Sequence, residues 1–366
     1  MKLSFCIPTY NRCKFLKKNI DIIIRQIREL SVEKDVEILI NDNASPDQTE
    51  ELCLDFIKRN PDIHIEYNKN ENADITIYAL GRSAKRLEER FSDVATDKLH
   101  FVSHDVNEKP DFDFDVDYII HAASNAYPAV FNSDPVGTIL SNVVGTNYLL
   151  DYAKNHNTIR FLFVSSGEVY GQCDPKLTAF KEELSGYVDP TQPRSCYPAS
   201  KRAAETLCVS YTKQFGLDTV IARPCHTYGP SATKSDNRAN AQFVNNAVAG
   251  EDIVMKSAGL QMRSYCYVAD CASAMLSVLL CGKSCEAYNI ANKDARVTIA
   301  DFARAVAKAA GQKVVFEEPD ELAKAQQTNI SYAVLDSDKL YDLGWCGKYT
   351  VENGVQNTVV IMKDWD

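Results

Sequence analysis

Glycine is absent from the first 80 residues of this 366-residue chain; the first one is Gly81. Glycine-rich turns let a backbone approach a phosphate closely, so no such turn can lie in this stretch. Long apolar runs are also lacking, and the sequence predicts no membrane span. With no apolar secretory leader at its start, the sequence predicts a cytoplasmic protein.

Basic runs and paired cysteines are missing as well. Asp and Glu number 50 against 40 Lys and Arg, a net charge of -10, which argues against a nucleic-acid partner. The 12 cysteines include no C-x-x-C pair, and no His or Cys cluster has zinc-ligand spacing. The sequence therefore predicts reduced thiols and no metal site.

Short β-branched runs alternate with amphipathic helical patterns over most of the chain. This alternation predicts an α/β fold, a doubly wound parallel sheet of βαβ units. The expected strands are residues 3–7, 36–40, 63–67, 75–79, 99–102, 118–121, 161–165 and 219–223, and the expected helices include 13–30, 47–58, 136–155, 197–215 and 299–310.

A polar, turn-like segment at residues 67–72 separates two kinds of motif. We therefore predict a βαβαβ segment over residues 1–72, a dinucleotide-binding domain over 73–225 and a smaller substrate-binding lobe over 226–366. The strand at 3–7 is expected to fill the central place between the strands at 75–79 and 118–121, because a parallel sheet without its middle strand leaves backbone groups unpaired.

The first 70 residues join LSFCIPTYNR to VEILINDNASPDQT, two strands that each end in a polar loop. This resembles the opening of family 2 glycosyltransferases, and the resemblance implies base or ribose contacts at Pro8, Thr9 and Asp42. The metal-binding Asp-x-Asp pair of such enzymes is not evident. The alternating aspartates at 111, 113, 115 and 117 are interpreted as a solvated approach to the next strand.

Downstream, VSSGEVYG at 164–171 precedes Tyr197-Pro-Ala-Ser-Lys201 by about thirty residues. Arg223-Pro224, Tyr228-Gly229-Pro230 and the RSYCYV strand that begins at Arg263 follow in order. Together these motifs resemble the NAD-dependent epimerase/dehydratase family, extended short-chain dehydrogenases that act on nucleotide sugars, with a Rossmann-like fold.

The resemblance implies a set of functional residues for an NAD cofactor and a nucleotide-sugar substrate. The implied catalytic residues are Tyr197, Lys201, Ser166 and Glu168. Implied NAD contacts are Arg82, Asp105, Ala122, Ala123, Asn142, Ser165, Tyr197, Lys201, Arg223 and Pro224, and implied substrate contacts are Arg263, Ser166 and Tyr228.

The expected chemistry begins with Tyr197 and Lys201, four residues apart on one helical face. The lysine and the cofactor's positive ring should lower the pKa of the tyrosine, whose phenolate then takes the proton of the sugar 4-hydroxyl. Ser166 should hydrogen-bond the same oxygen. Gly167-Glu168 stands where dehydratases carry Asp-Glu, which argues against a 4,6-dehydratase and leaves UDP-glucuronate decarboxylase and 4-epimerase open.

Three further expectations follow from the resemblance and from its gaps. The family's first glycine loop is missing, so NAD should bind weakly or not at all. The alternative functions are glycosyl transfer through residues 1–70 and a catalytically silent nucleotide-sugar binder. A homodimer is expected through the helices 136–155 and 197–215, with Leu140, Val144, Leu207 and Tyr211 as outer positions.

Overall fold

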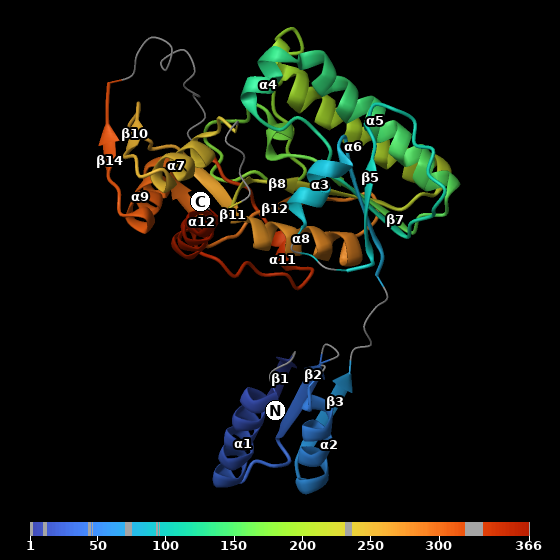
Figure 1. The fold of residues 1–366 in the computed structure, drawn as a ribbon, viewed down its shortest axis with the longest axis vertical. Helices are drawn as coiled ribbons and strands as arrows, with labels where there is room; N and C mark the ends of the chain where they lie inside the picture. Colours follow the sequence, from blue (N-terminus) through green and yellow to red (C-terminus); the bar gives the residue numbers. More distant parts are fainter. Residues whose placement is uncertain are drawn as a thin grey trace. The chain divides into compact units, whose positions relative to one another are not determined.

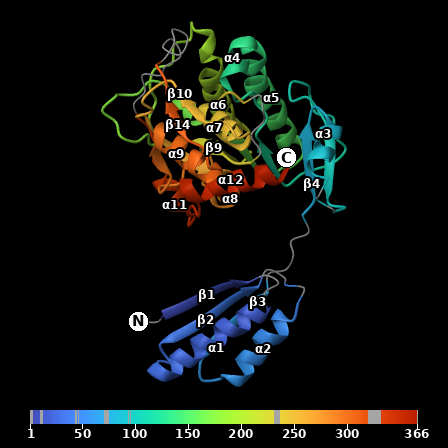
Figure 2. The ribbon, with the colours of Figure 1, turned by 60° about the vertical axis from the view of Figure 1, so that its left-hand side comes forward.

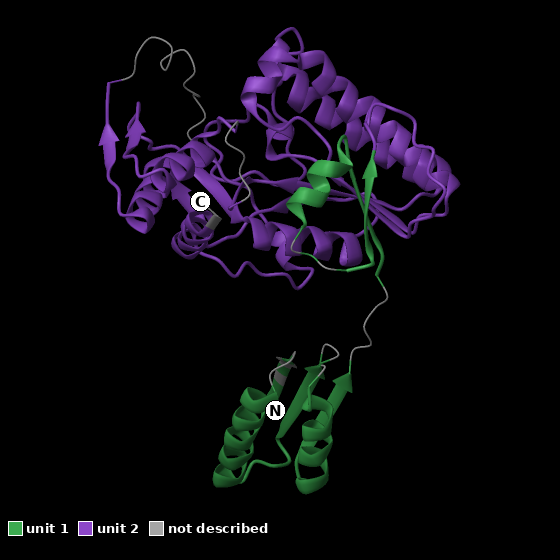
Figure 3. Ribbon diagram, viewed as in Figure 1, with its two compact units in different colours: residues 1–103 green, residues 104–366 purple. Residues whose placement is uncertain are grey.

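The computed structural model describes residues 3–9, 13–42, 45, 47–69, 75–92, 94, 96–230, 236–318 and 332–365. The chain forms two compact units, residues 1–103 and residues 104–366 (Figure 3).

Unit 1 begins with a three-stranded parallel sheet in the order β1-β2-β3. Strands β1 (Leu3–Thr9), β2 (Val36–Asp42) and β3 (His64–Lys69) alternate with helices α1 (Cys13–Leu30) and α2 (Thr49–Arg59). Both helices cover the same face of the sheet, where Ile20 and Phe56 pack against Ile38 and Ile40 of the central strand (Figure 2). This is the βαβαβ arrangement that the hydrophobic periodicity predicts.

A second parallel pair in unit 1 consists of β4 (Ile77–Gly81) and β5 (Leu99–Ser103), joined through α3 (Ala84–Arg90). The prediction that the strand at residues 3–7 would pair with the strands at 75–79 and 118–121 is wrong. Among the described strands, β1 pairs with β2 alone, in register from Leu3 opposite Val36 to Thr9 opposite Asp42. Consecutive elements are usually neighbours in space, and β1 lies beside β2, the next strand along the chain.

Unit 2 contains a four-stranded parallel sheet in the order β12-β8-β7-β6. Its strands are β6 (Tyr118–His121), β7 (Arg160–Val164), β8 (Thr219–Pro224) and β12 (Ala287–Ile290). Helices α5 (Pro135–Asn155) and α6 (Cys196–Phe215) lie over one face, and α8 (Val268–Cys281) lies over the other (Figure 1). Because successive side chains of a strand point to opposite faces, Phe161 and Phe163 of β7 pack toward α5 and α6, and Leu162 packs toward α8. The fold is the predicted doubly wound α/β architecture.

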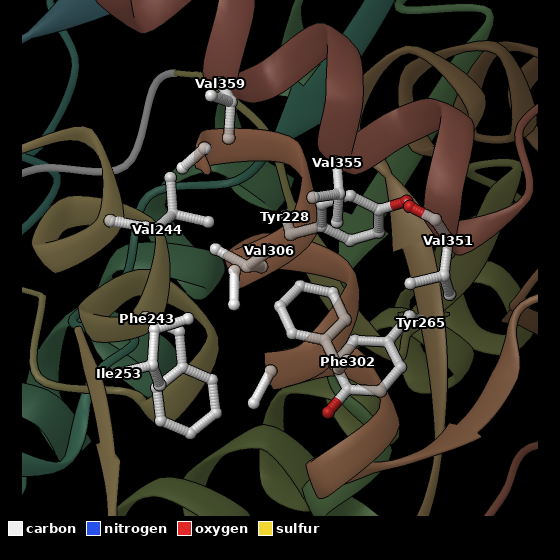
Figure 4. Packing of buried hydrophobic residues seen from close by; sticks show 14 of the residues in the cluster. Tyr228, Phe243, Val244, Ile253, Tyr265, Phe302, Val306, Val351, Val355 and Val359 are labelled. Atoms are coloured by element: carbon white, nitrogen blue, oxygen red, sulfur yellow. The ribbon is translucent and has the colours of Figure 1, made fainter. Parts of the chain in front are cut away.

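The rest of unit 2 forms a smaller lobe with its own core, shown in Figure 4. Tyr228, Tyr265 and Phe302 form its aromatic centre, and Val351 and Val355 of the last helix close it. The remaining elements of unit 2 are α4 (Pro128–Ser133), β9 (His226–Tyr228), α7 (Ala239–Val248), β10 (Ile253–Met255), β11 (Met262–Tyr267), β13 (Arg296–Thr298), α9 (Ile299–Ala310), β14 (Val314–Phe316), β15 (Tyr332–Ala333), α11 (Asp338–Tyr341) and α12 (Val351–Trp365). Within the described ranges, none of the helices combines the length and apolarity that crossing a bilayer requires.

Candidate functional site

The predicted serine, tyrosine and lysine meet where strand β7 ends and helix α6 begins. The Ser166 hydroxyl oxygen accepts the amide of Glu168 at 3.2 Å and so caps a 3-10 turn, Gly167–Tyr170. The same hydroxyl forms a hydrogen bond with the phenol of Tyr197, on the first turn of α6. The fold therefore brings Ser166 and Tyr197 into direct contact.

Lys201 lies one turn after Tyr197, with 2% of its surface exposed. Its ammonium donates to the carbonyl of Val164 at 2.8 Å and lies 4.6 Å from the centre of the Phe163 ring. Burial lowers the pKa of Lys201 to about 7, against the opposing charge of Glu205. A lysine in this state can exchange a proton near neutral pH.

The pKa of Tyr197 differs from the sequence-based expectation. Burial raises it to about 12, while the hydrogen bond from Ser166 and the charges of Arg238 and Arg194 oppose the rise. Lys201 was expected to lower this pKa, but a lysine whose own pKa is about 7 carries only part of a positive charge at neutral pH. The predicted lowering of the Tyr197 pKa also depended on the positive ring of the cofactor, so that prediction concerns the site with NAD bound.

Two buried polar atoms beside this group have no hydrogen-bond partner among the described residues. They are the Ser165 hydroxyl, at the end of β7, and the Asn142 side-chain oxygen, on α5. The amide group of Asn142 donates to Ser200 at 2.9 Å, which fixes the orientation of its oxygen. Buried polar groups are rarely left unpaired, so both atoms are candidates for contact with a bound molecule.

Glu168 contacts Arg194, a residue that the sequence reasoning missed. One terminal guanidinium nitrogen donates to both carboxylate oxygens of Glu168, at 3.0 and 2.9 Å. The guanidinium also lies over the ring of Phe131, which stacks on the ring of Tyr197 with the centroids 4.6 Å apart. The position of Arg194 three residues before Tyr197 was the available signal, but nothing in the sequence indicated that α4 brings Phe131 to the same place.

The side chain of Arg223 is held by other residues of unit 2. All three of its nitrogens donate within the chain: two to the Glu205 carboxylate, at 2.9 and 2.7 Å, and the third to Tyr170 and to the carbonyl of Glu182. The pairing with Glu205 raises the pKa of Arg223 despite its burial. This geometry gives Arg223 a structural role, while Pro224 ends β8 opposite Ile290.

Unit 2 contains cavities of different sizes. A cavity of about 280 Å³ is lined by Tyr127, Thr227, Tyr228, Asn240 and Arg238, whose charge acts on Tyr197. A larger one, of about 470 Å³, is lined by residues that include Glu205 and Arg223. Tyr197 and Ser166 line neither cavity, but only the smaller one contains a residue, Arg238, whose charge acts on Tyr197. The smaller cavity is therefore the better candidate for substrate.

The two other predicted substrate contacts are buried in the smaller lobe. Tyr228 packs within its aromatic centre and donates weakly, at 3.4 Å, to the carbonyl of Thr350 (Figure 4). Arg263 lies on β11, and burial lowers its pKa. Tyr228 reaches the smaller cavity, whereas Arg263 is not among the residues that line it.

The remaining predicted cofactor contacts lie on both units. Ala122 and Ala123 follow β6 and are exposed, as backbone that a ligand could approach would be. The Asp105 carboxylate accepts the backbone and side-chain amides of Asn107 at 2.9 and 3.0 Å. Arg82 follows β4 in unit 1 and is exposed.

Two of the transferase-like residues of unit 1, Thr9 and Asp42, are buried. Asp42 is fully buried, and its carboxylate accepts hydrogen bonds from Ser45 and, at 2.7 Å, from the phenol of Tyr67. Thr9 is buried opposite Asp42, and the side chain of Pro8 lies outside the described part. The base or ribose contact at Asp42 stays a prediction, and the carboxylate already accepts from both of these partners.

The acidic series before β6 also has a structural explanation. Asp111, Asp113, Asp115 and Asp117 are exposed, while Phe112 and Phe114 between them stack on each other. This agrees with the interpretation of a solvated approach to the strand. Across the described residues, no three His, Cys, Asp or Glu side chains are grouped to hold a metal ion.

Comparison with known families gives two matches along the chain. The model described as "NAD dependent epimerase/dehydratase family" matches residues 65–291, and the one described as "Glycosyl transferase family 2" matches residues 4–75. The chain is 31% identical over 269 residues to UDP-glucuronic acid decarboxylase 1 of Xenopus tropicalis, covering 73% of this chain and 61% of that protein. It is 34% identical over 262 residues to UDP-glucuronic acid decarboxylase 3 of Arabidopsis thaliana, covering 70% and 72%.

The fold is similar to that of several solved structures. UDP-glucose 4-epimerase of Thermotoga maritima, solved with UDP-glucose, superposes with a TM-score of 0.60 at 20% identity, over 99% of each chain. The dTDP-glucose 4,6-dehydratase of Bacillus anthracis, in complex with NAD, gives 0.55 at 21% identity, over 99% of this chain and 97% of that one. WbmF of Bordetella bronchiseptica, in complex with NAD+ and UDP, gives 0.63 at 18% identity, over 84% and 87%.

Proposed function

Because the chain belongs to the NAD dependent epimerase/dehydratase family, whose model matches residues 65–291, we propose that it decarboxylates a nucleotide-linked uronic acid. UDP-glucuronate is the first substrate to test, since the UDP-glucuronic acid decarboxylases of Xenopus and Arabidopsis named above are relatives of this chain. The observation that carries the proposal is the group formed by Ser166, Glu168 and Tyr197, in which Gly167 stands where a dehydratase would need a second acid.

The residues of this group can perform the proton transfers of a decarboxylation. Tyr197 takes the proton of the sugar 4-hydroxyl as that carbon is oxidised, and Ser166 holds the same oxygen. A ketone at C4 makes the C6 carboxylate a β-keto acid, which loses CO2 and leaves its electrons in an enolate. Glu168 lies beside Tyr197 and is the candidate for handling the proton that C5 then gains. Expelling a hydroxyl is not required, so a second acid is not needed.

The residues of unit 2 fit the nicotinamide end of NAD, which when bound accepts the C4 hydride and returns it. Tyr197 and Lys201 would hold its ribose, and the unpaired atoms of Ser165 and Asn142 are available to it. The fit is incomplete at the pyrophosphate, because the chain has no glycine before Gly81 from which the usual cradle could be built.

The test is to incubate the full chain with UDP-glucuronate and millimolar NAD and to measure both CO2 and the nucleotide sugar produced. We expect CO2 release with formation of UDP-xylose. Conversion of UDP-glucuronate to its 4-epimer without CO2 would instead make the protein an epimerase. Sugar transfer that depends on a divalent metal and not on NAD would reject the proposal.

We also propose that the protein forms a homodimer through α5 and α6. Exposed apolar side chains on α5 support this, with Val136 at 64%, Ile139 at 42% and Leu140 at 45% exposure. Tyr211 does not belong to the outer positions, because it is 9% exposed and donates to Asn147 at 3.0 Å. Analytical ultracentrifugation at micromolar concentration tests the proposal, and a monomer of 40.9 kDa would refute it.

A further inference from the structure

Arg194 keeps unused N–H donors on its guanidinium beside the reactive group. Only one of its terminal nitrogens contacts Glu168, and among the described residues the other two nitrogens have no hydrogen-bond partner. The side chain is 45% exposed. The two forks of paired N–H donors on a guanidinium both include the nitrogen that here holds Glu168. A second carboxylate can therefore accept from one of the free nitrogens and share the bound one with Glu168.

The position of the Arg194 guanidinium is fixed relative to Tyr197. The Arg194 guanidinium lies 4.7 Å from the centre of the Phe131 ring, and Phe131 is fully buried. The same Phe131 ring stacks on Tyr197 at an interplanar angle of 22°. Stacking on an aromatic face removes much of the freedom of an arginine side chain, so the guanidinium is preorganised before any ligand arrives.

The other cations near Tyr197 are less available to a substrate. Arg238 donates through two nitrogens to the buried carboxylate of Asp236, at 2.6 to 3.1 Å. Lys201 is buried, and its ammonium donates to Val164. Among the described residues, Arg194 thus keeps two guanidinium nitrogens without a partner and Arg238 keeps one, and their side chains are 45% and 39% exposed.

Resting on the decarboxylase function proposed above, we propose that Arg194 binds the carboxylate of the sugar and so selects uronic acids over neutral sugars. The sugar carbon that carries this carboxylate is bonded to the carbon whose hydroxyl Tyr197 deprotonates. The carboxylate must therefore lie within a few bond lengths of Tyr197. Arg194 lies near this region, because it stacks on Phe131, which contacts Tyr197, and binds Glu168.

Glu168 gives this contact a second consequence. A neutral sugar leaves the Arg194–Glu168 ion pair intact, whereas a sugar carboxylate competes for the same guanidinium. Sharing the guanidinium weakens its hold on Glu168 and frees that carboxylate to act beside Tyr197. The substrate's own charge would thus help to release a residue that its reaction uses.

The experiment measures dissociation constants of UDP-glucuronate and UDP-glucose by calorimetry, with the full chain and excess NAD. The wild type is compared with Arg194→Gln, Arg194→Lys and the control Arg304→Gln, which removes an exposed arginine paired with Asp301 in the smaller lobe. We expect Arg194→Gln to reduce the preference for UDP-glucuronate by about tenfold to a hundredfold, the usual range for a lost charge-assisted hydrogen bond. UDP-glucose binding should stay unchanged, Arg194→Lys should keep part of the preference, and the control should keep all of it.

Each result either supports or overturns the role of Arg194 in binding the sugar carboxylate. A folding defect would weaken both nucleotide sugars, so UDP-glucose binding in the same variant reports on the integrity of the site. An unchanged preference in Arg194→Gln, or a wild type with no preference for UDP-glucuronate, overturns the role of Arg194. The decarboxylase function fails separately, if the wild type prefers UDP-glucuronate yet releases no CO2 from it.

Discussion

Each unit has buried polar side chains in its α/β layers: Asp42 in unit 1, and Asn142 and Ser165 in unit 2. The two units differ in whether the polar atoms of these side chains have hydrogen-bond partners. Asp42 accepts hydrogen bonds from Ser45 and Tyr67, on its own sheet and loop. Asn142 and Ser165 each keep one polar atom without a partner among the described residues. A satisfied group stabilises the fold, whereas an unsatisfied one costs free energy that a ligand can recover. The difference makes the unpaired atoms of unit 2 better candidates for ligand contact than the Asp42 carboxylate.

The start of helix α1 extends the comparison. Helix N-termini bind anions through free amides, and an unoccupied one could replace a missing glycine turn. Here the amide of Cys13 donates to the Asp47 carboxylate at 2.9 Å, and the other Asp47 oxygen accepts the amide of Thr49 at 3.2 Å. The chain thus supplies its own anion at this position, which leaves less capacity for a phosphate.

The largest effect is expected from removing the Tyr197 hydroxyl. Tyr197→Phe deletes the group that takes the 4-hydroxyl proton, so kcat for CO2 release should fall by about 10² to 10⁴. The matched control is Tyr187→Phe, at a tyrosine of the same unit that is 62% exposed, and it should keep wild-type kcat. Equal activity in the two variants would mean that the site of unit 2 is not where the chemistry happens.

The second prediction concerns the cofactor. We expect NAD to bind about two to four orders of magnitude more weakly than to a relative with the glycine loop. Two lost hydrogen bonds to charged oxygens cost about 1.5–3 kcal/mol each, and about 1.4 kcal/mol is tenfold. The NAD content of the purified protein, followed by calorimetric titration, measures this. Co-purified NAD or a micromolar dissociation constant would show that another part of the chain replaces the cradle.

A third prediction uses the pKa of Lys201, which burial lowers from 10.5 to about 7. Between these pH values the unfolded chain binds a proton that the folded chain lacks, so this group makes the folded state more stable as pH rises through the window. Below pH 7 the cost of the buried charge is fully present. Lys201→Met should therefore raise the free energy of unfolding by about 3 kcal/mol near pH 6, after allowing for the lost hydrogen bond to Val164, and by little near pH 10.

Chemical denaturation of wild type and Lys201→Met at several pH values tests this, with activity measured in parallel. The variant should be more stable at neutral pH and inactive, as expected where a site is built at the expense of stability. A variant that is equally destabilised at all pH values would show that Lys201 acts through packing alone.

Much of the fold could be predicted from the sequence, because hydrophobic periodicity is a local property. The helices at 13–30 and 299–310 and the strand at 118–121 have the predicted bounds, and the other predicted strands shift by one or two residues at their ends. The partner of the first strand was not predictable in this way. Its alternating apolar residues fit any parallel neighbour, and the choice of β2 depends on the packing of α1 and α2 around Ile38 and Ile40.

The site was predictable where its residues share one strand end and one helix. Ser166 and Tyr197 follow from β7 and α6, and the structure brings them together. Arg194 and Phe131 were missed because their contacts join η2 (Pro193–Ser195) to α4, two segments far apart in the sequence. The outward direction expected for Tyr211 failed for a similar reason, since Asn147 of α5 accepts its hydroxyl.

The smallest effect is expected in unit 1, where Asp42→Ala removes a carboxylate that accepts from Ser45 and Tyr67. Leaving these donors unsatisfied in a buried place should lower the free energy of unfolding of this unit by about 1–3 kcal/mol. Hydrogen exchange read by mass spectrometry can follow residues 36–69 separately from unit 2, and Asp62→Ala, at a half-exposed carboxylate near Arg28, is the matched control. CO2 release and binding of UDP-glucuronate should stay at wild-type values if Asp42 only holds Ser45 and Tyr67 in place. A variant that loses nucleotide-sugar binding while unit 1 keeps its protection would mean that Asp42 contacts a ligand, and that the transferase-like segment is a site after all.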